Sequence, residues 1–561
     1  MTYDLGTAKA PRLAGRALEA ATAALEHPVT GLLASHKLMQ DLGILDFRRA
    51  HIPEPPTVGP DLPRLGSIDG SSSTPLDLEA IVKGARPANG FAFESAADFH
   101  EAYRSGRADP VVVAERFIAA AERLDKGEGA MHIFIERNNE RVLAEARASR
   151  ERYRQHAPLG PLDGVPITIK DELDVDGYHT TVGTRFLKNL ATDDAASVAR
   201  LRKAGAVILG KVNMYEIGID TSGFNAHHGT PTNPYAPGHY PGGSSSGSAA
   251  SVAAGFGPIS VGADGGGSIR IPAALCGVVG LKATWSRITE LGAFPLCASV
   301  GHVGPLGATV RDVALAYAIM AGPEPLDHDS LHQPAVHLTG FGDEDLRHLR
   351  FGFYRPWVEH ASPEVTRAVW DALDVFRQQG AEIIEVSVPE LDRVRIAQAI
   401  TILCEMATCM ERFDAEHRRD YGLGVRINLA IARSLTGRDY VQAQRMRTRF
   451  QRHLATVFEK VDVIVTPTTA QTAPPIAADV FPRGESNLEV TSNLMRYSFP
   501  ANLSGNPALS VPGGYDAHAR PIGIQLMGRP WEEHVLLRAG EVLERRVARR
   551  SPVIHTRLLR D

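Results

Sequence analysis

Two kinds of hydrophobic periodicity alternate along the chain. Residues 165–170 alternate between hydrophobic and other side chains, which is the two-residue period of a β-strand. Residues 196–204 have helical spacing, and a glycine separates them from the short hydrophobic run 206–209. The same order of helix, glycine and strand returns over residues 363–388. This recurring order of helix and strand predicts an α/β protein whose sheet is covered by helices on both faces.

A long helical stretch interrupts this rhythm. From residue 392 to 459 the pattern is almost wholly helical, with few prolines and a mixed charged surface. Strand-like runs follow at 461–467 and 521–527. We therefore expect a helical cap, at about 391–460, inserted into the α/β domain before the chain returns to the sheet.

The first 90 residues have a different character. Residues 12–45 are rich in alanine and leucine with helical spacing, whereas residues 51–75 are rich in proline, glycine and serine. Proline at that density cannot continue a helix, so this stretch is expected to be an extended linker or a strap on the surface. We predict an N-terminal extension over 1–90 and a main domain over 91–561.

Composition excludes several classes of partner. The 561-residue chain has a formal net charge of −5, so it lacks the basic field that a phosphate backbone attracts. Hydrophobic content of 43% and charged content of 22% are ordinary for a soluble globular protein. The four cysteines form no C-x-x-C pair, and we expect them to be reduced and buried. Nucleic acid is not expected as a partner.

Targeting signals are weak. The first ten residues lack the basic and apolar regions of a signal peptide. The strongest apolar run, residues 313–321, is far shorter than the roughly 20 residues of a membrane-spanning helix. We expect a cytoplasmic chain without a transmembrane segment. Peripheral contact with a membrane and formation of a homodimer both stay open.

The strongest chemical signal is a run of three glycines, Gly265, Gly266 and Gly267, followed by Ser268. Glycine lets a substrate oxygen approach backbone N–H groups, and a nest of such donors can hold an oxyanion beside the serine hydroxyl. Upstream lie a serine cluster at 242–250 and a lysine in the segment 161–171. Together these segments form a Ser/Ser/Lys candidate for acyl transfer.

Competing motifs are weaker. The sequence around Ser245 matches the G-x-S-x-G nucleophile elbow, but that elbow needs a strand directly before it, and residues 234–242 have loop composition. Neither a G-x-G-x-x-G nor a Walker sequence is present, and the histidines lack partners at metal-ligand spacing. No metal or other cofactor is expected.

The three segments closely resemble the amidase signature family of serine amidohydrolases, over about residues 91–330 and again over 460–545. The resemblance implies an α/β fold with a large mixed central sheet. It also implies that Lys170 is the general base, that Ser268 is the nucleophile, and that Ser244, after a cis peptide, is the bridging serine.

The same resemblance assigns the oxyanion hole to the N–H groups of Gly265, Gly266, Gly267 and Ser268. Asp264 and Arg270 flank this loop with opposite charges, and we expect them to pair and hold it rigid.

Within the family, the sequence is most similar to the plant-type fatty acid amide hydrolases. The residues that carry this similarity are 244–250, 264–268, 271–277 and the proline-bearing segment 51–56. Ile271 departs from the glutamine common at that place in the transamidation subunit that makes glutaminyl-tRNA.

This similarity implies a small-molecule amide substrate with a lipid-like acyl chain. Met214, Tyr215, Ile217 and Phe224 are candidates for contacts with the acyl chain, and ordinary core packing is the other interpretation of each. Two alternatives stay open: an aryl or small aliphatic amidase, and a subunit that needs partners to channel ammonia in an amidotransferase assembly.

Overall fold

The structure is a computed structural model that describes residues 3–6, 11–63, 76–84, 90–127 and 129–560. The predicted proline-rich strap therefore lies partly outside the described residues.

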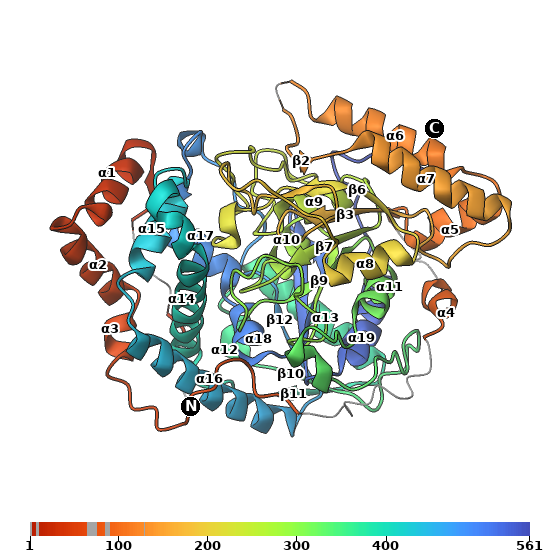
Figure 1. The fold of residues 1–561 in the computed structure, drawn as a ribbon. Helices are drawn as coiled ribbons and strands as arrows, with labels where there is room; N and C mark the ends of the chain where they lie inside the picture. The colour runs from red at the N-terminus through yellow and green to blue at the C-terminus, as the bar shows by residue number, and fades with distance from the viewer. Residues whose placement is uncertain (1–2, 7–10, 64–75, 85–89, 128, 561) are drawn as a thin grey trace.

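A mixed sheet of eleven strands forms the centre of the described chain (Figure 1). The strand order is β11-β10-β12-β15-β14-β8-β9-β7-β3-β6-β2. Pairs at the middle of the sheet are antiparallel, whereas β10 with β11 and β12, and β3 with β6 and β7, are parallel. The strands are β2 (Phe134–Glu136), β3 (Pro166–Lys170), β6 (Val207–Val212), β7 (Ile259–Ala263), β8 (Val279–Lys282), β9 (Val303–Gly307), β10 (Arg350–Phe353), β11 (Glu382–Glu385), β12 (Val463–Pro467), β14 (Ala508–Tyr515) and β15 (Pro521–Gly528).

Two short pairs lie outside this sheet. They are β1 (Leu13–Ala14) with β13 (Glu485–Ser486), and β4 (His179–Thr180) with β5 (Asn189–Leu190).

Helices cover both faces of the sheet, which confirms the predicted fold class. One group, α9 (Ser246–Ala253) and α10 (Arg270–Leu275), packs on β3, β7, β8 and β14. Another group packs on β9, β12 and β14 and consists of α11 (Val310–Met320), α13 (Pro363–Gln378) and α19 (Glu533–Arg546). The remaining helices in this domain are α5 (Ala96–Arg104), α6 (Pro110–Leu124), α7 (Asn139–Arg154), α8 (Ala196–Lys203), α12 (Arg355–Val358), α17 (Leu488–Met495) and α18 (Phe499–Ser504).

Three helices lie between β11 and β12: α14 (Leu391–His417), α15 (Leu423–Ala432) and α16 (Gly437–Phe458). Figure 1 shows them at one end of the molecule beside the N-terminal helices α1 (Gly15–Glu26), α2 (Thr30–Asp41) and α3 (Ile44–Phe47). Leu18 of α1 is fully buried in a hydrophobic cluster with Ile427 and Ile431 of α15. The short helix α4 (Leu78–Val82) instead packs on α11.

The described part of the proline-rich segment lies along α16. Thr448 donates a hydrogen bond to the carbonyl of Pro55 at 2.7 Å, and Gln442 donates to the carbonyl of Ala50 at 2.7 Å. Ile52 is buried among the side chains of this region.

The topology brings two chemical segments to one edge. Strands β3 and β7 are parallel neighbours with Ile169 opposite Val261, and β3 ends at Lys170 while β7 ends at Ala263. Because the carboxyl ends of parallel strands meet at the same edge, Lys170 lies beside the loop that follows β7. No helix in the described part of the chain is long and apolar enough to cross a bilayer.

Candidate active site

Lys170 and Ser244 are in direct contact. The Nζ atom of Lys170 donates a hydrogen bond to Ser244 Oγ at 2.9 Å and another to the carbonyl of Ala263 at 3.2 Å. Both side chains are almost fully buried. The Gly243–Ser244 peptide bond is cis, and the carbonyl of Ser244 accepts a hydrogen bond from the N–H of Tyr215 at 3.0 Å.

Ser268 lies in the same cavity. Lys170, Ser244, Gly265 and Ser268 all line it, together with Glu172, Leu296 and Met406. The cavity volume is about 20 Å³, which is room for about one water molecule. The arrangement places two serine hydroxyls, a lysine and a glycine-rich backbone around one small space.

The neighbouring Ser245 has another partner. The Oγ atom of Ser245 donates to the carbonyl of Ala263 at 3.1 Å. Ser245 directly precedes α9 and does not follow a strand. This environment does not resemble the strand-to-helix elbow that the short G-x-S-x-G pattern would need.

Residues 264–268, which we call the glycine loop, are held in place by hydrogen bonds to three successive carbonyls. Asn502 donates to the carbonyl of Asp264 at 2.8 Å, Gln398 to that of Gly265 at 2.6 Å, and Ser498 to that of Gly266 at 2.7 Å. In a trans peptide the C=O and the following N–H point in opposite directions. The anchored carbonyls therefore fix the direction of the N–H groups of Gly265, Gly266 and Gly267.

One of the predicted oxyanion donors is already occupied. The N–H of Gly267 donates to Asp264 Oδ1 at 2.6 Å. Gly265, Gly266 and Ser268 are different, because no hydrogen bond found within the described residues uses their N–H groups. The structure thus leaves three of the four predicted donors available, and Gly267 stabilises the loop instead.

Close packing explains why this loop consists of glycine. A Cβ atom on Gly265 would lie 2.6 Å from Cys297 Sγ, and one on Gly266 would lie 2.9 Å from Met495 Cε. Of the three glycines, Gly267 is the one with a positive φ, at +131°. A side chain at Gly265 would therefore displace Cys297, and one at Gly266 would displace the flexible end of Met495, whereas at Gly267 a left-handed backbone favours glycine.

Asp264 and Arg270 form a fully buried ion pair. The guanidinium donates to both carboxylate oxygens, at 2.9 and 3.1 Å, and its remaining N–H groups reach Asn502, Gln525 and the carbonyl of Ser498. Burial alone would raise the pKa of the Asp264 carboxyl, but the charge and hydrogen bonds of Arg270 outweigh it and hold the pKa well below its usual range. Every N–H group of the Arg270 guanidinium therefore has an acceptor.

Carboxyl groups crowd the other side of the cavity. Glu172 Oε2 lies 2.6 Å from Lys170 Nζ, and Glu290 also lines the cavity. Burial, reinforced by the charge of Glu172, raises the pKa of Glu290 to about 8. Cys297 lines the cavity too, and burial raises the pKa of its thiol well above the ordinary value. Near neutral pH, Glu290 is therefore a neutral acid in the lining of the cavity.

The four predicted acyl-chain residues lie in a buried cluster next to the cavity. Met214 and Ile217 are fully buried, and Tyr215 and Phe224 nearly so. The cluster also contains Leu296 and Met406, but none of the four predicted side chains lines the cavity itself. A role for them in substrate binding stays a prediction.

A much larger groove lies beside the cavity. It has a volume of about 1060 Å³ and is lined by α14, by the start of α16 and by the segment 295–299. Leu296 and Cys297 of that segment face the cavity, whereas Pro295, Ala298 and Ser299 face the groove. The segment and α14 therefore separate the groove from the cavity, an arrangement that no local sequence motif indicates.

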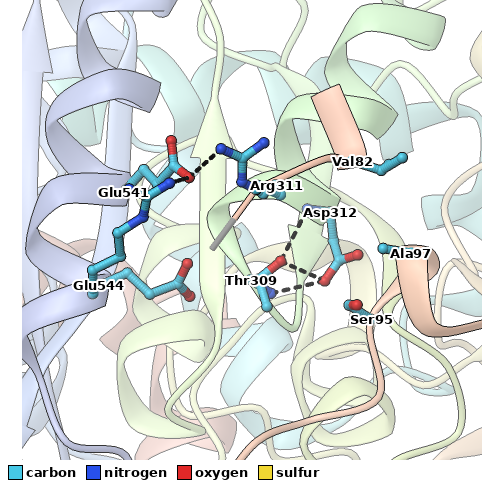
Figure 2. Close-up of a pocket in the computed structure, with 10 residues that line it drawn as sticks. Val82, Ser95, Ala97, Thr309, Arg311, Asp312, Glu541 and Glu544 are labelled. Atoms are coloured by element: carbon cyan, nitrogen blue, oxygen red, sulfur yellow. Dashed lines mark hydrogen bonds and ion pairs between the residues drawn. The ribbon is translucent and has the colours of Figure 1, made fainter. Parts of the chain in front are cut away.

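A further pocket shares no residue with the cavity. Figure 2 shows its lining, where Thr309 and Asp312 bond to each other at the start of α11 and Arg311 pairs with Glu541 at 2.6 Å. Burial raises the pKa of Asp312 to about 7. The volume of this pocket is about 60 Å³, and the polar groups that line it stabilise the junction of α11 and α19.

A family model described as Amidase matches residues 113–537. The chain belongs to the amidase family. It is therefore a hydrolase that acts on the carbon–nitrogen bonds of amides, which confirms the class of enzyme expected from the sequence.

Individual relatives lie in several branches of the family. A fatty acid amide hydrolase of Arabidopsis thaliana is 37% identical over 97% of this chain and 94% of its own length. One subunit of the glutamyl-tRNA(Gln) amidotransferase of Chloroflexus aggregans is 36% identical over 80% of this amidase and 95% of its own length. The solved structure of the peptide amidase of Stenotrophomonas maltophilia is 28% identical, with a TM-score of 0.71 over 82% of this amidase and 98% of that chain.

Replacement of Arg270 by methionine should destabilise the amidase severely. The change leaves the Asp264 carboxylate buried without its counter-charge, and such a loss typically costs about 3–5 kcal/mol. Urea unfolding measures the effect. Arg377→Met, which removes an exposed pair with Asp374, is the control and should change stability little. Equal effects of the two variants would show that the buried pair has no special role.

Replacement of Glu290 by glutamine should remove a loss of activity at alkaline pH. Above about pH 8 Glu290 ionises and adds negative charge beside Glu172, Glu405 and Asp327. That charge opposes an oxyanion in the cavity, so kcat/KM of the wild type should fall as the pH passes about 8.

The control for this experiment is Asp312→Asn, which removes a buried acid with a similarly raised pKa at the separate pocket. It should leave the alkaline fall in place. A fall that persists in Glu290→Gln would rule out Glu290 as its origin.

Proposed function

We propose that this amidase is a serine hydrolase of N-acyl amides and that Ser268, Ser244 and Lys170 carry the reaction. The observation on which the proposal rests is the 2.9 Å hydrogen bond from Lys170 to Ser244 in the cavity that Ser268 also lines. A lysine that holds one serine beside a second serine and a glycine loop is an arrangement suited to acyl transfer.

In the proposed mechanism, Ser268 Oγ attacks the amide carbonyl and its proton passes through Ser244 to Lys170. The N–H groups of Gly265, Gly266 and Ser268 stabilise the oxyanion. As the carbon–nitrogen bond breaks, the proton returns through Ser244 to the leaving amine. Water then attacks the acyl-enzyme by the same route and releases the acid.

Lys170 must be neutral before it can accept a proton. Glu172 Oε2 lies 2.6 Å from its Nζ, within reach of a direct proton transfer.

We propose that the acyl chain of the substrate occupies the large groove, which requires the wall formed by residues 295–299 and α14 to open toward the cavity when the substrate binds. Its lining contains Pro295, Ala298, Ala407, Ala432 and Leu435, and its volume of about 1060 Å³ is enough for a long chain. The N-terminal extension also favours a lipid-like substrate, because the plant fatty acid amide hydrolase aligns over 97% of this chain and so includes most of that extension.

Two other functions have support of their own. The similarity to the amidotransferase subunit favours a partner-dependent activity, and the fit to the peptide amidase structure favours a smaller amide. Hydrolysis of an amide by the purified chain alone would exclude the partner-dependent function.

Ser268 should be the residue that a fluorophosphonate modifies. We expect the phosphonyl mass on the peptide containing Ser268 and loss of turnover in Ser268→Ala. Ser248→Ala, which alters another buried serine of the same region, is the control and should keep most of the activity. Modification of a different serine would contradict the proposed nucleophile.

The specificity constant should rise with acyl chain length. Each methylene buried in the groove contributes about 0.8 kcal/mol, which corresponds to roughly a fourfold increase per carbon until the groove is full. A series of N-acyl ethanolamides measures this trend. Ala407→Phe, which fills part of the groove, should shorten the preferred chain without affecting the shortest substrates. A flat series would contradict the lipid-like substrate and leave the serine mechanism intact.

A further inference from the structure

The glycine loop has an anchor that comes from the helical cap. Gln398 lies on α14, is 1% exposed and donates through Nε2 to the carbonyl of Gly265 at 2.6 Å. Because a carbonyl oxygen can only accept, the amide nitrogen of Gln398 must be the atom that faces it. The Asn502 and Ser498 anchors, in contrast, come from α18 and from the residue that precedes it.

The peptide unit held by Gln398 is the one that contains the N–H of Gly266. That N–H points away from the anchored carbonyl and has no hydrogen-bond partner among the described residues. Ser498 holds the next unit, whose N–H is already bound to Asp264. Gln398 therefore acts on an available oxyanion donor, whereas Ser498 acts on an occupied one.

One stripe of α14 follows the catalytic loop. Gln398, Ile402 and Met406 are spaced by four residues and so share a face of the helix. A Cβ atom on Gly265 would lie 3.3 Å from Ile402 Cδ1, and Met406 lines the cavity.

The helix itself is fixed by hydrogen bonds to neighbouring elements other than the glycine loop. Gln444 of α16 donates to Thr401 at 3.0 Å, and Glu405 accepts hydrogen bonds from Tyr440 at 2.8 Å and from the N–H of Ser299 at 3.0 Å.

We propose that Gln398 is a positioning residue that orients the Gly266 N–H toward the oxyanion, so that the cap helix α14 completes the oxyanion hole. The inference rests on the proposed function, because it requires an oxyanion formed on Ser268. Gln398 touches no reacting atom, and its effect passes through the Gly265–Gly266 peptide unit.

The chain offers a closely matched control. Gln444 is also a glutamine that is 1% exposed, it also donates one hydrogen bond through Nε2, and its Oε1, like that of Gln398, has no partner within the described residues. Its hydrogen bond stabilises the same helix but does not reach the glycine loop. Gln398→Met and Gln444→Met thus remove equivalent groups, and the first alone removes the anchor of an oxyanion donor.

The experiment compares kcat, KM and the inhibition constant of an acyl trifluoromethyl ketone in the two variants and the wild type. Addition of Ser268 to this ketone forms an oxyanion, so its affinity reports the oxyanion hole. In Gln398→Met we expect kcat to fall about 10- to 100-fold, less than the ~10²- to 10³-fold loss when an oxyanion donor is removed outright. Ketone affinity should fall by a similar factor and KM should change little.

Gln444→Met should stay within about threefold of the wild type in all three quantities. Equal losses in the two variants, or a loss of kcat in Gln398→Met without a loss of ketone affinity, would overturn the inference. If Gln398→Met does not fold, Gln398→Glu keeps the shape, loses the donor when ionised, and is judged by the same two criteria.

The wild type separates this inference from the proposed function. Hydrolysis of an N-acyl amide and modification of Ser268 by a fluorophosphonate establish the proposed nucleophile, and the variants then test Gln398 alone. A wild type that fails both measurements removes the proposed function, and the inference about Gln398 falls with it.

Discussion

The buried ion pair between Asp264 and Arg270 is the interaction on which the glycine loop depends. The carboxylate accepts hydrogen bonds from the N–H groups of Gly267 and Ile269, and the guanidinium reaches Asn502 and Gln525. Removal of two charges from water is costly. Here the carboxylate and the guanidinium also have hydrogen-bond partners besides each other, which is the condition under which a buried ion pair is tolerated. The result is a loop whose dipoles are oriented before a substrate arrives, so no reorganisation is needed during the reaction.

Local patterns in the sequence predicted much of this arrangement. The strand that ends at Lys170, the loop around Ser244 and the glycine run before Ser268 are continuous segments whose residue types indicate their chemistry. The anchors of the loop could not be predicted in this way. Asn502 acts on Asp264 across 238 residues and Gln398 acts on Gly265 across 133. A helical period indicates which face of a helix is buried but not which distant backbone atom meets a polar side chain on that face.

Two further features of the site depend on burial and backbone geometry. Of the three glycines, Gly267 is the one with a positive φ, at +131°, whereas a Cβ atom on Gly265 would lie 2.6 Å from Cys297 Sγ. Met214 and Ile217 lie in a buried hydrophobic cluster, and their contact with an acyl chain stays a prediction. An apolar residue next to an active site has the same pattern whether it packs in the core or lines a pocket, so sequence alone does not separate the two.

The distance along the chain between the loop and its anchors has a consequence for synthesis. Ser268 leaves the ribosome more than 200 residues before Ser498 and Asn502, and the intervening chain includes the whole helical cap. A nascent chain that ends before these residues has the serine and the glycines but lacks the anchors of the Asp264 and Gly266 carbonyls, and long-range contacts of this kind form late in folding. An incomplete chain thus holds Ser268 in a loop that is only partly oriented.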